Sequence, residues 1–313
     1  MILALDIGGT AVKLGLVDQA GTVHARSTAD VCFDGYRTPV FDTVLAAARR
    51  FLREMGTSVE GAAVSATGQI DTVRGTVIGT NGKIPGYEGT ALKAGLEDAL
   101  GVETWALNDA NAAVLGECFT GRARGLRDVV MVTLGTGVGG GIVSGGRLLD
   151  GRLGIGGELG HFPLYAEGIP CACGLRGCYE NYASVTALIR RCEEATGWLG
   201  LTGRMIFERA EEGDERIRQA LDAWVQDVAA GICGLVHLLN PEMVLIGGGV
   251  SVQEDLLIRP LRDQVLRQVM PRFREGLRVE RALLGNDAGL IGAVRFWLDC
   301  RERETLRNGD EAL

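Results

Sequence analysis

The sequence predicts an α/β protein with a mixed sheet in each of two similar lobes. Two observations support this prediction. Strands alternate with helices along most of the chain, and one unit, a strand, a glycine turn and a second strand, occurs twice. The first glycines of the two copies, Gly8 and Gly135, lie about 127 positions apart. We therefore expect lobes at 1–117 and 118–313, with the last helix, about 288–304, able to pack back on the first lobe.

The bulk composition indicates an ordinary soluble globular protein. The 313 residues are enough for two cores, and 46% of them are hydrophobic and 23% charged. A net charge of −8 argues against a nucleic-acid groove and against an anionic membrane surface. No apolar stretch approaches the roughly 20 residues of a membrane span, and Asp6 interrupts the first apolar run. We expect a cytoplasmic protein with no nucleic-acid partner and no membrane partner.

In the first half of the chain, apolar runs and turn residues define the elements in order. Residues 2–5 and 12–17 are expected to be strands on either side of the turn Asp6–Thr10, and 22–26 a third strand. Phe41–Met55 has the apolar spacing of an amphipathic helix. The other elements expected here are a strand at 62–66, loops at 67–71 and 81–89, a helix at 91–100, a strand at 102–107 and a helix at 110–119.

The second half repeats the hairpin and then becomes richer in helices. The apolar run 129–134, the glycine turn 135–141 and Ile142-Val143 form the second hairpin. Apolar residues at helical spacing predict a long helix at 217–239, which Asn240-Pro241 stops. The other elements expected here are a helix from the cap Ser184 to about Ala195, a buried strand at 243–246, a helix at 256–270, a strand at 278–284, the last helix and a polar tail that frays from Arg303.

Two glycine hairpins suit a nucleotide, because glycine lets backbone N–H groups approach a phosphate without a side-chain clash. Neither is a Rossmann or Walker motif, since a strand rather than a helix follows each turn. Each alone is as readily a structural turn, but the pair favours a nucleotide. Asp6 is expected to face Mg²⁺ through water, and Thr10 and Lys13 to lie near the transferred phosphate. The expected nucleotide-binding residues are Asp6, Gly8, Gly9, Thr10, Lys13, Gly135, Thr136, Gly137 and, for adenosine, Gly247, Gly248 and Gly249.

Four residues have the composition of a zinc site. His161, Cys171, Cys173 and Cys178 supply one imidazole and three thiolates, which is a closed tetrahedral set for Zn²⁺. Because no ligand position is left open, the zinc is expected to be structural. Unligated thiols are the alternative. The remaining cysteines, at 32, 118, 192, 233 and 300, are scattered and are expected to be buried inert thiols.

Asn108 and Asp109 stand where a strand passes into a helix. Either residue type is a good N-cap there, so capping is one interpretation. A carboxylate at the end of a strand, facing an interlobe cleft, is also well placed to accept a hydroxyl proton. Asn108, Glu158, His161 and Glu180 offer the donors and acceptors that a polyol needs, although Glu180 could equally be a helix-end carboxylate.

Taken in order, these motifs resemble the ROK family of repressors and sugar kinases. The resemblance implies the actin-like, hexokinase-type two-lobe ATPase fold with duplicated β-hairpin phosphate loops and a zinc-bound insertion. It implies ATP with Mg²⁺, one structural Zn²⁺, a hexose phosphorylated at its 6-hydroxyl, and a homodimer or homotetramer. By the same resemblance Asp109 is the catalytic base, and the sugar contacts are Gly68, Asn81, Asn108, Asp109, Glu158, His161 and Glu180. The motifs are residues 6–10, 108–112, 134–141, 157–161, 171–180 and 285–293.

One departure leaves the substrate open. Thr67-Gly68-Gln69-Ile70 stands where the family often has Pro-Gly-Pro-Val, in a loop that shapes the sugar pocket. Glucose is the first choice, with N-acetylmannosamine, N-acetylglucosamine, fructose, allose or a β-glucoside as alternatives. A repressor would need a DNA-reading module before the first hairpin, where Asp6 already stands. A non-catalytic sugar sensor is disfavoured by Asp109, Lys13 and the full glycine loops.

Overall fold

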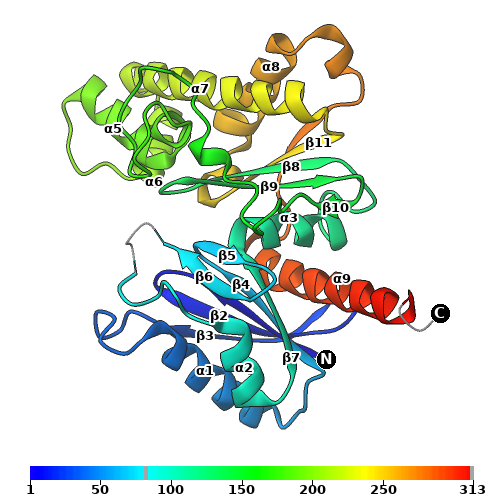
Figure 1. Cartoon of the computed structure of the whole chain (residues 1–313). Helices are drawn as coiled ribbons and strands as arrows, with labels where there is room; N and C mark the ends of the chain where they lie inside the picture. Colours follow the sequence, from blue (N-terminus) through cyan, green and yellow to red (C-terminus); the bar gives the residue numbers. More distant parts are fainter. Residues whose placement is uncertain (81–83, 311–313) are drawn as a thin grey trace. The chain divides into compact units, whose positions relative to one another are not determined.

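The computed structural model describes residues 1–80 and 84–310, with side chains through residue 306 (Figure 1). The chain divides into two compact units. The first comprises Met1–Gly125, Asp150–Gly156 and Asn286–Leu313, and the second Leu126–Leu149 and Gly157–Gly285. A boundary at 117 would cut a continuous helix that ends at Phe119, so the first unit continues to Gly125. The last helix belongs to the first unit.

The first unit contains a five-stranded sheet and four helices among the described residues. Its elements are β1 Ile2–Ile7, β2 Ala11–Val17, β3 Val23–Asp30, α1 Val40–Met55, β4 Gly61–Ala66, β5 Gln69–Asp71, β6 Thr76–Gly79, α2 Leu92–Leu100, β7 Glu103–Asn108, α3 Asp109–Phe119 and α9 Ala288–Asp310. The sheet order is β3-β2-β1-β4-β7, with β5 and β6 as a separate hairpin. Helices α1 and α2 cover one face of the sheet, and α3 and α9 the other.

The alternation of side chains along β1 decides what lies on each face. Leu3, Leu5 and Ile7 join the apolar core that includes residues of α1 and α2. Because successive side chains of a strand point to opposite faces, Asp6 lies on the other face, where α9 packs. Strand β4 consists of Gly, Ala, Val and Ser and is buried throughout, so α9 can approach it closely. This arrangement carries Asp6 to the first turn of α9.

The second unit is built around a second five-stranded sheet. Its elements are β8 Val129–Leu134, β9 Val138–Ser144, β10 Arg147–Leu148, the 3-10 turn Leu159–His161, α4 Glu180–Ala183, α5 Val185–Thr196, α6 Gly203–Glu211, α7 Glu215–Leu239, β11 Met243–Gly247, the 3-10 turn Gly249–Val252, the π-helix Glu254–Ile258, α8 Arg259–Gln268, the 3-10 turn Pro271–Arg274 and β12 Arg278–Arg281. The 3-10 turn Gly285–Asp287 precedes α9. Helix α7 has a buried apolar stripe that includes Ile217, Trp224 and Ile232. This stripe belongs to the core of the second unit.

The two sheets have the same topology. In the first, β1 runs antiparallel to β2 and parallel to β4. In the second, β8 runs antiparallel to β9 and parallel to β11. The second order, β10-β9-β8-β11-β12, therefore repeats the first strand for strand. The expected mixed sheets and the repeated hairpin are confirmed.

Several expected boundaries were wrong in detail. Residues 67–71 were expected to be a loop, but Gln69–Asp71 forms β5 and pairs with β6. The helix expected at 256–270 begins as a π-helix and is α-helical only over Arg259–Gln268. The strand expected to reach residue 284 ends at Arg281, and α9 extends to Asp310 rather than 304. Among the described residues, no helix combines the length and apolar character needed to cross a membrane.

Candidate functional site

The first glycine turn joins β1 to β2 and is closed by its own backbone. The Gly8 N–H donates to the carbonyl of Ala11 at 2.9 Å. The Gly9 carbonyl accepts the Tyr36 hydroxyl, and the Thr10 carbonyl accepts the Val31 N–H. Thr10 itself is exposed. The turn therefore holds its shape within the first unit, with an exposed hydroxyl at its end.

Asp6 stands just before this turn and is surrounded by polar groups. Its carboxylate accepts the Ser65 hydroxyl at 2.7 Å and the Lys13 ammonium at 3.2 Å. Lys13 is the cross-strand partner of Asp6 in the β1–β2 register and also reaches Asn286 Oδ1 at 3.3 Å. A methyl group at Gly289 would lie 2.8 Å from the Asp6 carboxyl carbon.

Glycine at 289 thus admits the carboxylate to the first turn of α9, where the helix dipole favours a negative charge. The sequence motifs indicate Asp6 and Lys13 but neither Ser65 nor a role for Asn286. Ser65 sits in β4 beside Asp6, in parallel register, and Asn286 is 273 residues from Lys13. The only sequence signal for Asn286 was its place in the motif at 285–293.

The second glycine turn joins β8 to β9, and its carbonyl groups are tied to the start of α5. Val185 N–H donates to the Gly135 carbonyl, and the Thr186 hydroxyl to the Thr136 carbonyl, both at 2.8 Å. Gly135 N–H donates to the Gly137 carbonyl at 3.0 Å. Within the described parts of the chain, the N–H groups of Thr136 and Gly137 donate to no protein acceptor. Such unpaired N–H groups can bind an anion.

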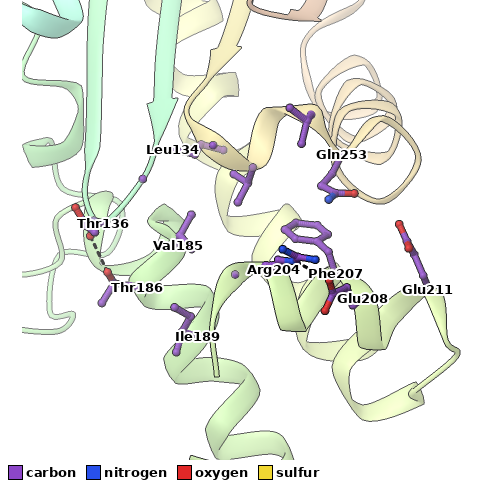
Figure 2. A pocket seen from close by; sticks show the side chains of 15 residues that line it. Leu134, Thr136, Val185, Thr186, Ile189, Arg204, Phe207, Glu208, Glu211 and Gln253 are labelled. Carbon is purple, nitrogen blue, oxygen red and sulfur yellow. Dashed lines mark hydrogen bonds and ion pairs between the residues drawn. The ribbon is translucent and has the colours of Figure 1, made fainter. Parts of the chain in front are cut away.

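A cavity of about 600 Å³ lies beside this turn, entirely within the second unit (Figure 2). Apolar side chains such as Val185, Ile189 and Phe207 line it together with polar groups. Figure 2 shows Phe207 and Gln253 facing the same space from different segments. The full lining is Leu134, Gly135, Thr136, Val185, Thr186, Ile189, Gly203, Arg204, Phe207, Glu208, Glu211, Gly249, Val250, Val252 and Gln253. Apolar walls with a few polar groups are typical of a small-molecule site.

The three consecutive glycines have different local roles. Gly249 lines the cavity. Gly248 has φ +89°, and a methyl group there would overlap the Leu134 carbonyl oxygen of β8. Gly247 is the last residue of β11 and packs against Met131 and Thr133. Helix α6, which supplies Phe207 and Glu211, was not expected from the sequence.

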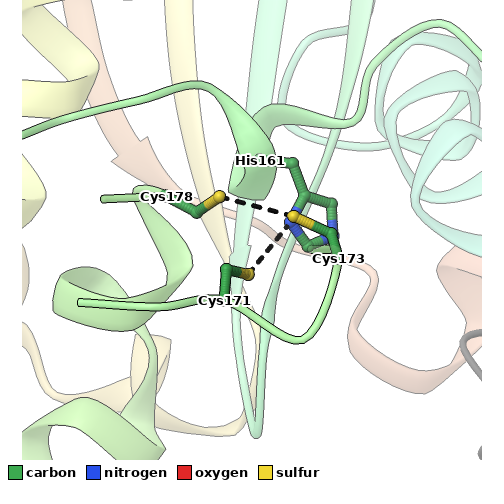
Figure 3. Close-up of side chains that lie close together, drawn as sticks. All are labelled: His161, Cys171, Cys173 and Cys178. Atoms are coloured by element: carbon green, nitrogen blue, oxygen red, sulfur yellow. Dashed lines mark hydrogen bonds between the residues drawn. The ribbon is translucent and has the colours of Figure 1, made fainter. Parts of the chain in front are cut away.

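His161, Cys171, Cys173 and Cys178 meet in one cluster (Figure 3). Their ligand atoms all lie within 4.8 Å of one another. Cys173 Sγ and Cys178 Sγ are 3.5 Å apart, and Cys171 Sγ and His161 Nδ1 are 3.7 Å apart. A disulfide needs about 2.05 Å between the sulfur atoms. A tetrahedron with Zn–S bonds of about 2.3 Å has edges of about 3.8 Å. The donor set and its spacing therefore fit zinc.

Asn108 is a helix cap, as one interpretation of the sequence expected. Its Oδ1 accepts the N–H groups of Ala110 and Asn111, at 2.9 and 3.2 Å. Its Nδ2 donates to the Gly68 carbonyl at 2.8 Å, which brings the two predicted sugar contacts together. Asp109 is the first residue of α3, and its Oδ1 accepts the N–H of Ala110 at 2.8 Å.

Two buried polar atoms near the start of α3 have no hydrogen-bond partner among the described residues. They are the hydroxyl of Tyr87 and Oδ1 of Asn111. Burial, together with the negative charge of Asp109, raises the pKa of Tyr87 above its usual range. The hydroxyl therefore stays protonated and can donate a hydrogen bond. The sequence gives no signal for Tyr87, which stands alone in a turn, and Asn111 is indicated only by its place in the motif at 108–112.

The remaining predicted sugar contacts of the second unit, Glu158 and Glu180, precede and follow the cysteine cluster in the sequence. Glu158 is exposed and precedes the turn that carries His161. Glu180 begins α4, and its Oε2 accepts the Val138 N–H at 2.9 Å. Asn81 lies outside the described residues. The structure thus shows local surroundings for each of these residues except Asn81.

Comparison with known proteins supplies the family. A ROK family model matches residues 2–300 of the chain. The chain belongs to the ROK family. A glucokinase from Thermotoga maritima is 34% identical over 310 residues, covering 94% of this chain and 96% of that protein. A β-glucoside kinase from Listeria monocytogenes is 33% identical, covering 96% and 99%.

A solved structure shows the same relationship. The ROK family glucokinase from Streptomyces griseus, in complex with glucose and AMPPNP, has a TM-score of 0.81 and 32% identity. The match covers 94% of this chain and 98% of that one. The ROK family predicted from the sequence motifs is therefore confirmed, and with it the α/β fold of ROK sugar kinases.

Proposed function

We propose that this ROK family protein is an ATP-dependent sugar kinase that phosphorylates the 6-hydroxyl of a hexose, with glucose as the first candidate. One observation carries the proposal. The N–H groups of Thr136 and Gly137, which donate to no acceptor among the described residues, lie in a turn that borders an apolar cavity of about 600 Å³. The relatives support the substrate class, since the Thermotoga protein is a glucokinase and the Streptomyces structure holds glucose and AMPPNP.

The second unit would bind the nucleotide. The cavity offers apolar surface for the base, with Gln253 and Glu211 as polar partners, and the glycine turn offers backbone N–H groups to the phosphates. Phosphoryl transfer depends on alignment and on charge stabilisation.

The first unit would bind Mg²⁺ and contribute a cation. The Asp6 carboxylate is the kind of oxygen ligand that Mg²⁺ prefers, and Lys13 beside it supplies a positive charge for phosphate. When bound, Mg²⁺ would neutralise phosphate charge. Gly8, Gly9 and Thr10 would complete this phosphate side.

Asp109 would be the general base. It stands at the end of β7 in the first turn of α3, and Asn108 caps that helix and holds Gly68. A carboxylate fixed in this way can accept the proton of a sugar hydroxyl as the hydroxyl attacks the phosphoryl group. Asn108, Gly68 and Asn81 would bind the sugar from the same unit.

The cysteine cluster would hold a structural zinc ion. Three thiolates and the His161 imidazole leave no open ligand position, so the ion would fix the loop and take no part in the reaction. His161 has a second ring nitrogen, which could bind a sugar hydroxyl while the first binds the metal. Glu158 and Glu180 would add two carboxylates to the sugar site.

The test is a coupled assay of ADP release from purified protein. Glucose, N-acetylmannosamine, N-acetylglucosamine, fructose, allose and a β-glucoside are compared at equal concentration. We expect glucose to give the highest kcat/KM; the β-glucoside kinase relative makes the β-glucoside the second candidate. A protein that binds sugar and nucleotide but releases no ADP would be a sensor and would refute the proposal.

Asp109→Asn tests the base directly. The Asn side-chain oxygen can still accept the Ala110 N–H, so we expect the fold and the sugar affinity to be kept. Loss of a general base lowers kcat by roughly 10²–10⁴-fold. The measurements are kcat and sugar binding by calorimetry. Near-normal kcat in this variant would remove Asp109 from the role.

A further inference from the structure

Glu180 contacts the second glycine turn directly. Its Oε2 accepts the Val138 N–H at 2.9 Å, where β9 begins. A methyl group at Gly137 would overlap the same oxygen and lie 3.1 Å from the carboxyl carbon. The carboxylate is therefore packed against the backbone of the turn. Glycine at 137 is what makes room for it.

The rest of the segment 180–186 also holds this turn. Val185 N–H and the Thr186 hydroxyl bind the carbonyl groups of Gly135 and Thr136. Because these hydrogen bonds are made to carbonyl oxygens, they do not occupy the N–H groups of Thr136 and Gly137, which can still bind a ligand. Among the contacts of the described residues, Glu180 is the one member of the segment whose side-chain oxygen accepts an N–H next to the turn, that of Val138.

The two oxygens of the Glu180 carboxylate have different surroundings. Oε2 accepts the Val138 N–H beside the turn, whereas Oε1 makes no hydrogen bond within the described part of the chain. A carboxylate oxygen has two lone pairs, so Oε1 is available to a substrate hydroxyl. One side chain can thus serve the turn and the sugar at once.

We propose that Glu180 is a positioning residue for the nucleotide as well as a sugar contact, because its carboxylate fixes the turn that presents N–H groups to the phosphates. This inference rests on the proposed function, since it assumes that the turn binds nucleotide. It assigns to Glu180 an effect that a residue acting on sugar alone would not have. That effect is on nucleotide affinity in the absence of sugar.

Two substitutions of Glu180 separate its effect on the position of the turn from the effect of its negative charge. Removing a negative charge near phosphates favours nucleotide binding, so Glu180→Ala alone would combine two opposed effects. Glu180→Gln removes the same charge but keeps an oxygen for the Val138 N–H. We expect the dissociation constant for ADP, measured by calorimetry without sugar, to be about five- to twentyfold larger in Glu180→Ala than in Glu180→Gln.

Zinc content and melting temperature equal to those of wild type would show that both variants are folded. Glu158→Ala is the matched control, because Glu158 is a proposed sugar contact whose side chain is exposed. It should leave sugar-free ADP binding within twofold of wild type. Equal ADP affinity in Glu180→Ala and Glu180→Gln would overturn the inference while leaving the kinase proposal intact. A wild-type protein that binds no nucleotide would overturn both.

A double-mutant cycle gives an independent check. Gly137→Ala places a methyl group against the Glu180 carboxylate and should weaken ADP binding by about tenfold or more. In the Glu180→Ala background that carboxylate is absent, so the same substitution should weaken ADP binding by less than threefold. Equal losses in both backgrounds would show that the contact does not position the turn.

Discussion

The contact between α3 and α9 depends on two glycines, and an alanine at one of them should be strongly destabilising. A methyl group at Gly292 would overlap the Ala112 carbonyl oxygen and lie 2.8 Å from the Gly116 nitrogen. The atoms in the way are backbone, so no side-chain rotation relieves the overlap. Overpacking in a core costs typically 1–3 kcal/mol, and a backbone clash belongs at the upper end. Alanine regains about 1 kcal/mol of helix propensity, which leaves a net loss of about 2 kcal/mol.

Gly234 provides the matched control for Gly292→Ala. It lies in α7, is exposed, and a methyl group there would meet none of the described residues within 4 Å. Gly234→Ala should therefore stabilise the protein by about 0.5–1 kcal/mol through helix propensity alone. The assay is thermal unfolding, compared as melting temperatures because two units can unfold separately.

The expected shifts have opposite signs. At roughly 2–4 °C per kcal/mol, Gly292→Ala should melt about 4–8 °C below wild type, and Gly234→Ala slightly above it. Because α3 carries Asp109 in its first turn, Gly292→Ala should also lower kcat, which Gly234→Ala should not. A Gly292→Ala protein that melts within 1 °C of wild type would refute the claim that these helices need glycine at their contact.

Three further predictions follow from single side chains. Cys173→Ser should lower bound zinc, measured by inductively coupled plasma mass spectrometry, from one ion per chain to a small fraction; unchanged zinc would disprove the ligand set. Burial raises the pKa of Cys192 and of Cys233 to about 11. Both thiols should therefore resist alkylation at pH 8 until urea unfolds the protein. Rapid labelling of the native protein would contradict their burial. Tyr87→Phe removes a buried hydroxyl that has no hydrogen-bond partner among the described residues, so we expect a melting temperature equal to or above that of wild type. A large decrease would show that the hydroxyl has a partner such as bound water.

The two hairpins were predictable because their signals are local. An apolar run, a glycine turn and a second apolar run specify antiparallel pairing within a few residues, as β1 with β2 and β8 with β9 show. The cysteine cluster was predictable for a similar reason, since all four ligands lie between 161 and 178. In both cases the residues that meet are close in the sequence.

What the sequence did not indicate depends on distant contacts or on weak patterns. Strand β5 has only three residues, and its pairing with β6 gives no apolar alternation to read. The contacts of Asp6 with Ser65 and of Lys13 with Asn286 join segments 59 and 273 residues apart. Nothing in a single sequence indicates which residues far apart along the chain will be in contact. The Glu180 contact with Val138 was hidden in the same way, 42 residues apart.

The two glycine turns occupy equivalent places in identical sheet topologies, yet different groups surround them. Next to the first are a carboxylate and an ammonium group, Asp6 and Lys13, beside the first turn of α9. The second has no side-chain cation among its described contacts and presents backbone N–H groups, with its carbonyl groups bound by the segment that starts α5. Repetition of the hairpin therefore does not imply repetition of its chemistry. A cation and a carboxylate suit a metal-bound, reacting phosphate, whereas fixed N–H groups suit a phosphate that only has to be held. On this reasoning, substitutions in the first turn should act mainly on kcat, and substitutions in the second mainly on nucleotide affinity.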